Sequence, residues 1–226
     1  MKTMLLGLLA LTLGSTAGEL EKAKADFSKQ DQTLNQVYAN LKKSLAPHLF
    51  SQVQQDQRDW IRYRDGISDF QTRGKAREDS IEWYESAAGL TESRVNWLKG
   101  WAVIDQREGM VGKWSDSRGG WLEIVKKDGE FWFSLNVVRG PTYHLGQIGG
   151  KFRVNGNTGW FELESEFGDA PTWLTFVGIG DGTGRMRIIG ENTQPHHGAR
   201  AYFDGDYLWL GPLTAEEQRE VVEGRR

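Results

Sequence analysis

Three carboxylates in the second half of the chain have the spacing of residues that share one face of a β-strand. Glu162, Glu164 and Glu166 alternate with other residue types, and side chains two apart in a strand point to the same side. A pair of carboxylates is what a glycoside hydrolase uses as acid and as base or nucleophile. Three in alternation are more typical of the solvent face of an antiparallel sheet. We therefore interpret this run as an exterior strand face.

Two adjacent histidines are the best candidates for metal ligands. His196 and His197 are near Glu191 and Asp204 in the sequence, and imidazole and carboxylate groups both bind zinc. Adjacent residues of a strand point to opposite faces, so both histidines reach one ion only if they lie in a loop. We interpret the segment as a polar loop and predict no metal site and no cofactor.

Other catalytic patterns are missing from the sequence. It contains no Cys, which excludes disulfides, thiolate metal sites and cysteine nucleophiles. The glycine spacing of Asp181–Gly184 is like that of a phosphate loop, but no Lys-Ser/Thr pair follows it, so a hairpin turn is predicted. A Gly-x-Ser-x-Gly nucleophile motif does not occur. These observations predict a protein that is not an enzyme.

Tryptophan is abundant, with 10 residues. Trp132 and Trp173 are on strand faces opposite the most regular apolar runs. Such rings either pack against another part of the protein or form an exposed platform for sugar or peptide. Contiguous exposed apolar surface is rare in monomers, so packing is the favoured interpretation and binding by these two residues is the alternative.

Charged residues cluster in the segment Gln57–Asp65. Gln57 and Arg58 precede Arg64 and Asp65 by seven residues, which is two helical turns, so the two pairs share one side of a helix. One interpretation is an intramolecular network of arginine–carboxylate pairs. The other is a polar patch in which Arg58, Arg64 and Asp65 bind a partner.

The elements that carry these residues begin with a short apolar segment. Lys2 precedes an apolar run over residues 5–13, and Ser15 and Ala17 follow with the spacing of a cleavage site. This pattern predicts a signal peptide over residues 1–17 and a periplasmic or secreted protein without a lipoprotein cysteine. No later segment reaches the ~18 apolar residues of a membrane helix. The net charge of −3 becomes −4 without Lys2 and offers no basic excess for nucleic acid.

Residues 18–109 are predicted to form a helical domain. Apolar residues recur there every three, four or seven positions along three segments, which is the period of amphipathic helices. Pro47 ends the first helix or opens the second, and Arg73–Lys75 separates the second from the third. The segment Val53–Phe70 places Trp60 on the apolar face of the second helix, where we expect it in the core.

The period changes to alternation after residue 109, where 20 of the 28 Gly residues also lie. Turn signals such as Asp-Gly and Asn-Gly separate the alternating runs. The spacing predicts eight or nine short antiparallel strands over residues 110–212, in a barrel or a sandwich, and a barrel is favoured because closure hides strand edges. A capping box at Thr214–Glu217 predicts a short polar helix within residues 213–226. The predicted fold class is α+β.

Three motifs of the helical half carry a resemblance to a known family. They are Asp31-Gln32-Thr33-Leu34-Asn35 with Tyr38, Gln57-Arg58-Asp59-Trp60-Ile61-Arg62-Tyr63-Arg64-Asp65, and Leu90-Thr91-Glu92-Ser93-Arg94. Over residues ~23–100 the chain resembles the LprI-type helical domain of exported bacterial proteins, named after a lysozyme inhibitor. Members of that family usually carry cysteines around these helices, whereas this sequence has Gly66-Ile67-Ser68 at such a position and must hold its helices by packing alone.

The second half has only a loose resemblance, in architecture, to lipocalins and to the barrel inhibitors of lysozyme. Gly112-Lys113-Trp114 is similar to the opening of lipocalin-like barrels, and His197–Tyr207 is similar to the closing strand of small exported β-domains, with Ala199, Ala201 and Phe203 on one face. The Ser-Gly-x-x-Tyr loop motif of the barrel inhibitors does not occur.

The resemblance implies lysozyme inhibition as the function. We therefore expect an exported, non-enzymatic binding protein that protects the cell wall by plugging the lysozyme cleft. The alternative is a carbohydrate- or cell-envelope-binding module that uses the Trp-rich β-half. The expected partners are accordingly a lysozyme or a cell-wall glycan.

Overall fold

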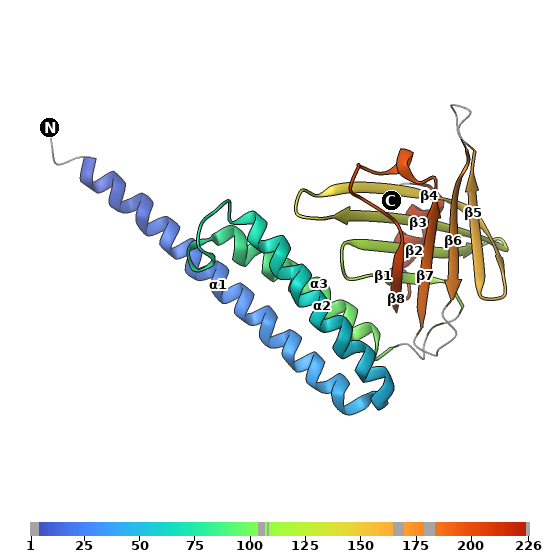
Figure 1. Ribbon diagram of the computed structural model, residues 1–226, viewed down its shortest axis with the longest axis horizontal. Helices are drawn as coiled ribbons and strands as arrows, with labels where there is room; N and C mark the ends of the chain where they lie inside the picture. Colours follow the sequence, from blue (N-terminus) through green and yellow to red (C-terminus); the bar gives the residue numbers. More distant parts are fainter. Residues whose placement is uncertain (1–4, 104–106, 108, 165–169, 179–183, 225–226) are drawn as a thin grey trace. The chain divides into compact units, whose positions relative to one another are not determined.

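The computed structural model describes residues 5–103, 107, 109–164, 170–178 and 184–224, with side chains from residue 17 onward. The chain divides into two units, Met1–Val95 and Asn96–Arg226. The first is helical and the second contains the sheet (Figure 1). The expected α+β fold class is confirmed, while the domain boundaries expected from the sequence remain predictions.

Three long helices build the first unit. They are α1 (Leu5–Ser44), α2 (Pro47–Gln71) and α3 (Ile81–Gly100), with a 3₁₀ turn, η1 (Arg77–Asp79), before α3. Pro47 opens α2 because a proline at the first helical position loses no intrahelical hydrogen bond. The break after α2 is where expected, and Arg73 and Gly74 there have φ angles of 52° and 88°. Among the described residues no helix has the length and apolar character needed to cross a membrane.

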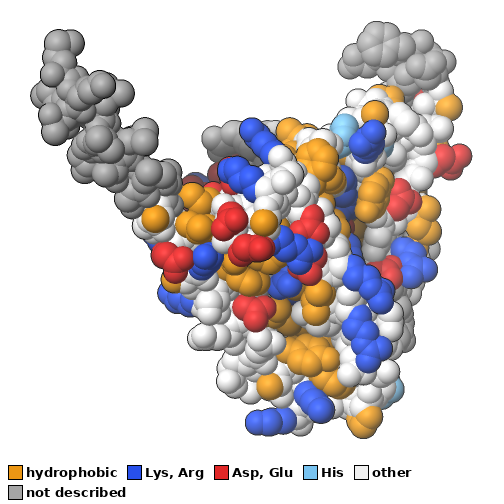
Figure 2. All heavy atoms as spheres, turned by 60° about the vertical axis from the view of Figure 1, so that its left-hand side comes forward, with side chains coloured by type: hydrophobic (Ala, Val, Ile, Leu, Met, Phe, Trp, Pro, Cys, Tyr) orange, Lys and Arg blue, Asp and Glu red, His pale blue; other side chains and the backbone are white. Residues whose placement is uncertain are grey.

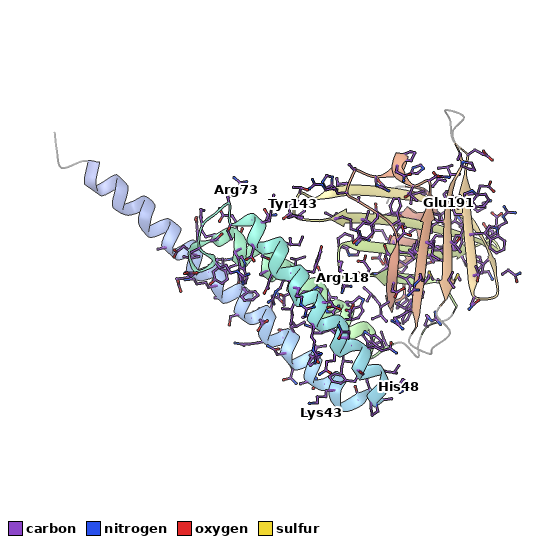
Figure 3. All side chains as sticks on the ribbon, viewed as in Figure 1. Lys43, His48, Arg73, Arg118, Tyr143 and Glu191 are labelled. Atoms are coloured by element: carbon purple, nitrogen blue, oxygen red, sulfur yellow. The ribbon has the colours of Figure 1, made fainter. Side chains whose placement is uncertain are left out.

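Each helix contributes one apolar face to the core of the helical unit. Trp60 and Val53 of α2 are fully buried, as the helical period predicts, and Leu34, Leu41 and Ala87 from the other two helices are nearly so. Figure 3 marks the two ends of α2 with His48 and Arg73. The chain has no Cys, so packing and polar contacts alone hold these helices together.

The sheet of the second unit is a closed barrel of eight strands in which each strand pairs with its neighbour in sequence and β8 returns to β1. All pairings are antiparallel. Because β8 also pairs with β1, the sheet closes into a barrel and does not form a sandwich. The strands are β1 (Gly112–Ser115), β2 (Gly120–Lys127), β3 (Glu130–Arg139), β4 (His144–Asn155), β5 (Thr158–Leu163), β6 (Thr172–Gly178), β7 (Arg185–Glu191) and β8 (Gly205–Gly211).

The barrel interior is filled by side chains. Phe133 lies 5.0–5.7 Å, between ring centroids, from Phe152, Phe161 and Phe176 in edge-to-face geometry, an arrangement that aromatic pairs prefer. The inner face of β3 is made by Phe133, Leu135 and Val137, which alternate along the strand and are almost fully buried. The turn between β2 and β3 is also as expected, because Asp128 and Gly129 have φ angles of 52° and 84°, as a two-residue hairpin requires.

The sequence predicts the closing strand of the barrel at His197–Tyr207, and this prediction is wrong. Residues 198–204 form a loop after a 3₁₀ turn, η3 (Gln194–His196), and the strand that closes the barrel is Gly205–Gly211. Ala201 and Phe203 are buried as the alternation implied, whereas Ala199, the third residue of that predicted face, is exposed. The backbone follows a turn in which Ala201 N donates to Gly198 O at 2.8 Å. Burial of alternate residues in a loop thus imitated a strand.

A short helix, α4 (Ala215–Val222), packs on the outside of the barrel. The expected capping box is present: Thr214 and Glu217 each accept a hydrogen bond from the other's backbone N–H. Val221 of α4 and Leu213 cover Val125 of β2. Lys113 of β1 binds Glu217 at 2.7 Å and connects the cap of α4 to the sheet.

Candidate functional site

The three motifs of the helical unit meet around one tryptophan. The guanidinium carbons of Arg64 and Arg94 lie 5.4 and 5.3 Å from the ring centroid of Trp60. Arg64 is one turn after Trp60 on α2, whereas Arg94 comes from α3. Cation–π contacts are strongest where water is excluded, and Trp60 is fully buried. We call Trp60, Arg64 and Arg94, with the polar groups that bind the two arginines, the motif core.

Arg94 is a fully buried cation with partners on α2. Its Nε donates to Gln57 Oε1 at 2.8 Å, and its Nη1 pairs with Asp56 Oδ2 at 2.6 Å. A buried charge is tolerated only when it is paired and hydrogen-bonded. Gln57 opens the second motif and Arg94 ends the third, so the two motifs bind each other across the α2–α3 interface.

Arg64 connects α2 to α1. Its Nε donates to Asp65 Oδ1 at 2.9 Å, its Nη1 lies 3.5 Å from Asp31 Oδ1, and its guanidinium lies 5.4 Å from the ring of Phe27. The Arg64 side chain is only 11% exposed. Asp31 belongs to the first motif, so all three motifs contribute to the motif core. Arg64 and Asp65 therefore have intramolecular partners.

Arg58 differs from the other two charged residues singled out in this segment. It is exposed on α2, and its neighbour Asp59 pairs with Arg62 at 2.9 Å. The structure thus brings Arg64 and Asp65 together and leaves Arg58 at the solvent face. Sequence reasoning did not single out Arg94 or Asp56 as site residues; the Leu-Thr-x-x-Arg motif was the available signal for Arg94.

The turn between α2 and α3 is held by a second polar group. Arg77 pairs with Asp69, and Trp83 Nε1 donates to Asp69 Oδ1 at 3.0 Å. The hydrogen bonds from Arg77, with a smaller contribution from Trp83, lower the pKa of Asp69 below its usual value despite partial burial. Arg77 also lies over the Trp83 ring, 5.3 Å from its centroid. This turn is exposed, and Figure 2 shows acidic and basic side chains interspersed on the face it displays.

The two tryptophans singled out on the barrel lie in different surroundings. Trp132 of β3 is half-buried against the Val125, Leu213 and Val221 cluster, and the Lys151 ammonium lies 5.1 Å from its ring centroid. Trp173 of β6 is half-buried on the outer face. Glu162 and Glu191 are its cross-strand neighbours.

One end of the barrel contains a buried ion pair that sequence reasoning missed. Arg139 of β3, 2% exposed, binds the Asp116 carboxylate at 2.5 Å and the Tyr202 carbonyl at 3.1 Å. Its Nη2 donates to the Tyr207 hydroxyl at 3.3 Å. Burial and the charge of Asp116 raise the pKa of Tyr207 well above its usual range, so the hydroxyl stays neutral.

This ion pair holds the loops at that end of the barrel together. Arg139 Nη1 also donates to the backbone carbonyl of Arg118, which Figure 3 labels in the β1–β2 loop. Tyr202, in the loop before β8, covers the guanidinium, with its ring centroid 4.5 Å away. Arg139 therefore connects β3 to the β1–β2 loop and to the loop before β8.

The histidine pair binds threonines. His196 Nε2 lies 3.2 Å from Thr172 Oγ1, and His197 Nε2 lies 3.0 Å from Thr193 Oγ1. Burial, and to a lesser degree the neighbouring His197, lower the pKa of His196. Within the described ranges, no group of three or more His, Asp or Glu side chains could hold a metal ion.

Of the three alternating carboxylates, the described residues include only Glu162 and Glu164. Glu162 and Glu164 are exposed, and the first of them faces outward from β5. Glu166 and residues 181–183 of the expected hairpin turn lie outside the described residues.

Comparison with known proteins assigns the helical region. Residues 12–98 match the family model described as "Lysozyme inhibitor LprI". The match covers α2 and nearly all of α1 and α3, so the helical part of this chain is LprI-like, as the three motifs indicated. Comparison with curated proteins gives no match, and neither does comparison with solved structures.

Proposed function

We propose that this protein is exported, acts by binding rather than by catalysis, and inhibits a lysozyme through its helical unit. The observation that carries the proposal is the match of residues 12–98 to the LprI lysozyme-inhibitor model. The signal-peptide pattern over residues 1–17 supports a periplasmic or secreted location. Inhibition there would protect the cell wall.

The contact with lysozyme would come from exposed residues and not from the motif core. Trp60 and Arg94 are fully buried, and Arg64 is nearly so, which supports a stabilising role for them and for Asp65. Arg58 is an exposed cation of the motif. Lysozymes use two carboxylates in their cleft, and an arginine can bind a carboxylate through two parallel hydrogen bonds. We propose that Arg58 pairs with such a carboxylate while the exposed face of α2 around it blocks the cleft.

An assay of cell-wall lysis with the full chain tests this proposal. The parent protein should inhibit at least one lysozyme of a panel, and Arg58→Gln should weaken inhibition by roughly tenfold or more. Lys43→Gln is the matched control, because Lys43 is also an exposed cation of the helical unit. Equal inhibition by both variants would reject the role of Arg58, and no inhibition by the parent would reject the function.

A second candidate function is binding of a cell-wall glycan by the barrel. The sequence indicates Trp132 and Trp173 as its candidate residues. The contacts of Trp132 with the α4 cluster and with Lys151 leave less of its ring available. The observation that supports this function is instead a groove lined by Trp160, which is a diagonal strand neighbour of Trp173.

A further inference from the structure

A depression of ≈ 660 Å³ lies beside β4, β5 and the β2–β3 turn, and is lined by residues of both faces of the barrel wall. Trp160 and Glu162 of β5 line it together with Lys151 and Arg153 of β4. Trp160 is half-buried, while the three charged residues are exposed. The groove therefore combines aromatic rings, those of Trp160, Phe131 and Phe152, with charged groups of both signs.

Strand geometry places a second tryptophan beside this groove. Trp160 and Glu162 are two residues apart on β5 and share its outer face. Glu162 is directly opposite Trp173 on β6, and Trp160 is opposite Thr175. The two tryptophans are thus diagonal neighbours, which lie roughly 7–8 Å apart between their Cα atoms. Glu162 is a strand neighbour of both tryptophans, opposite Trp173 and two residues after Trp160.

The charges of the groove balance in pairs. Lys151 pairs with Glu130 at 2.6 Å, and Arg153 lies 3.9 Å from Glu162. Arg153 is 72% exposed at its side chain and 5.9 Å from the centroid of Trp160. A groove with two cations and two anions favours a neutral ligand over a strongly charged one. Exposed ion pairs of this kind contribute little stability, so their groups can exchange partners when a ligand binds.

We infer that this groove binds a neutral oligosaccharide, with Trp160 and Trp173 as stacking platforms for successive sugar rings. A pyranose has an apolar C–H face and a rim of hydroxyl groups. The face matches an indole ring, which provides a large apolar area. The hydroxyl groups match Glu162 as acceptor and Arg153 as donor, both of which form charge-assisted hydrogen bonds. A few polar groups around an apolar surface are the usual composition of small-ligand sites.

The inference gives the second candidate function a specific site and does not rest on lysozyme inhibition. The two can therefore fail separately. A variant that loses the sugar should still inhibit lysozyme, because Trp160 is in the barrel and the family match is confined to residues 12–98.

Calorimetry with the full chain tests the inference, with tetrasaccharides of N-acetylglucosamine and of glucose as neutral probes and a tetramer of galacturonic acid as the anionic one. A neutral tetrasaccharide should bind more tightly than the anionic probe. Trp160→Ala and Trp173→Ala should each weaken binding by roughly tenfold or more. Glu162→Gln should weaken it by a smaller factor, because an amide oxygen still accepts a hydrogen bond.

Trp121→Ala is the matched control. Trp121 is 44% exposed on β2, a strand that pairs with neither β5 nor β6, so its loss should leave binding unchanged. Circular dichroism checks that each variant is folded, and Arg153→Met replaces any variant that is not. The inference is overturned if neither neutral probe binds at millimolar concentration, if the anionic probe binds more tightly, or if Trp121→Ala is as harmful as the groove variants.

Discussion

The guanidinium of Arg94 on α3 donates a hydrogen bond to the side-chain carbonyl of Gln57 on α2 over 2.8 Å, with the arginine fully buried. The two residues are 37 positions apart and belong to different motifs of the LprI-like region. A motif of this domain is therefore part of its core, and the charged residues that make the motif recognisable serve mainly to connect helices. This relationship separates the residues that keep the domain folded from those available to a partner.

Replacing Arg94 should destabilise the helical unit. Arg94→Met keeps much of the side-chain length but leaves the buried Gln57 amide and the Asp56 carboxylate without their cation. Removing one partner of a buried pair costs about 3–5 kcal/mol, and the partial exposure of Asp56, 31% at its side chain, should bring the loss to about 2–4 kcal/mol. Urea unfolding followed by far-UV circular dichroism measures it. The double variant with Asp56→Asn should recover part of the loss, and a cost below about 1 kcal/mol for Arg94→Met would contradict the assignment.

Trp60 should be the most costly tryptophan of the helical unit to remove. Trp60→Ala deletes a fully buried ring and the platform for both arginines, and such truncations cost about 3–5 kcal/mol. The same unfolding measurement applies, with Lys43→Gln as an exposed control in the same unit. If Trp60→Ala costs less than about 1 kcal/mol, the ring is not part of the core.

The core of the helical unit could be predicted from the sequence, and its polar contacts could not. The helical period places Trp60 and Val53 inward by spacing alone, and the structure confirms both. The partners of Arg94 depend on how α2 packs against α3, which is a long-range property that a local period does not encode. For that reason the sequence identifies Gln57 as part of a motif but does not identify Arg94 as its partner.

The barrel shows the same limit in another form. Alternation and turn residues predicted the strands and the Thr214–Glu217 cap, because both signals are local. The closing strand was misplaced because Ala201 and Phe203 are buried from a loop. The sequence around Arg139 does not indicate that this residue is buried, because its carboxylate partner, Asp116, is 23 positions away.

The ion pair between Lys113 and Glu217, which connects α4 to the sheet, should weaken in acid. Although burial opposes it, the hydrogen bonds from Lys113 and Thr214 lower the pKa of Glu217 from 4.5 to about 2. A carboxylate with a lowered pKa adds stability above its unfolded pKa, and that stability is lost as the pH falls from about 4.5 through about 2. Thermal unfolding of the parent and of Glu217→Gln should differ by about 0.5–1 kcal/mol at neutral pH, and the difference should shrink toward zero as the pH falls to 2 and below. Parallel profiles at all pH values would contradict this role.

The exported protein should begin near Gly18. Residues 1–17 have the charged start, apolar run and small residues of a signal peptide. The first buried side chain among those described is Ala23, so the described part of the core lies entirely beyond the expected cleavage site. N-terminal sequencing of protein recovered from the cell envelope checks this, and an intact Met1 in that fraction would contradict it.

Titration calorimetry of the full chain against a panel of lysozymes tests the central claim most directly. We predict saturable binding of at least one lysozyme at micromolar concentration, with inhibition at matching stoichiometry. Lysozymes are commonly basic and this chain has a net charge of −3, so affinity should fall partly, and not completely, as salt is raised. If no lysozyme of the panel binds at micromolar concentration, the proposed function is wrong.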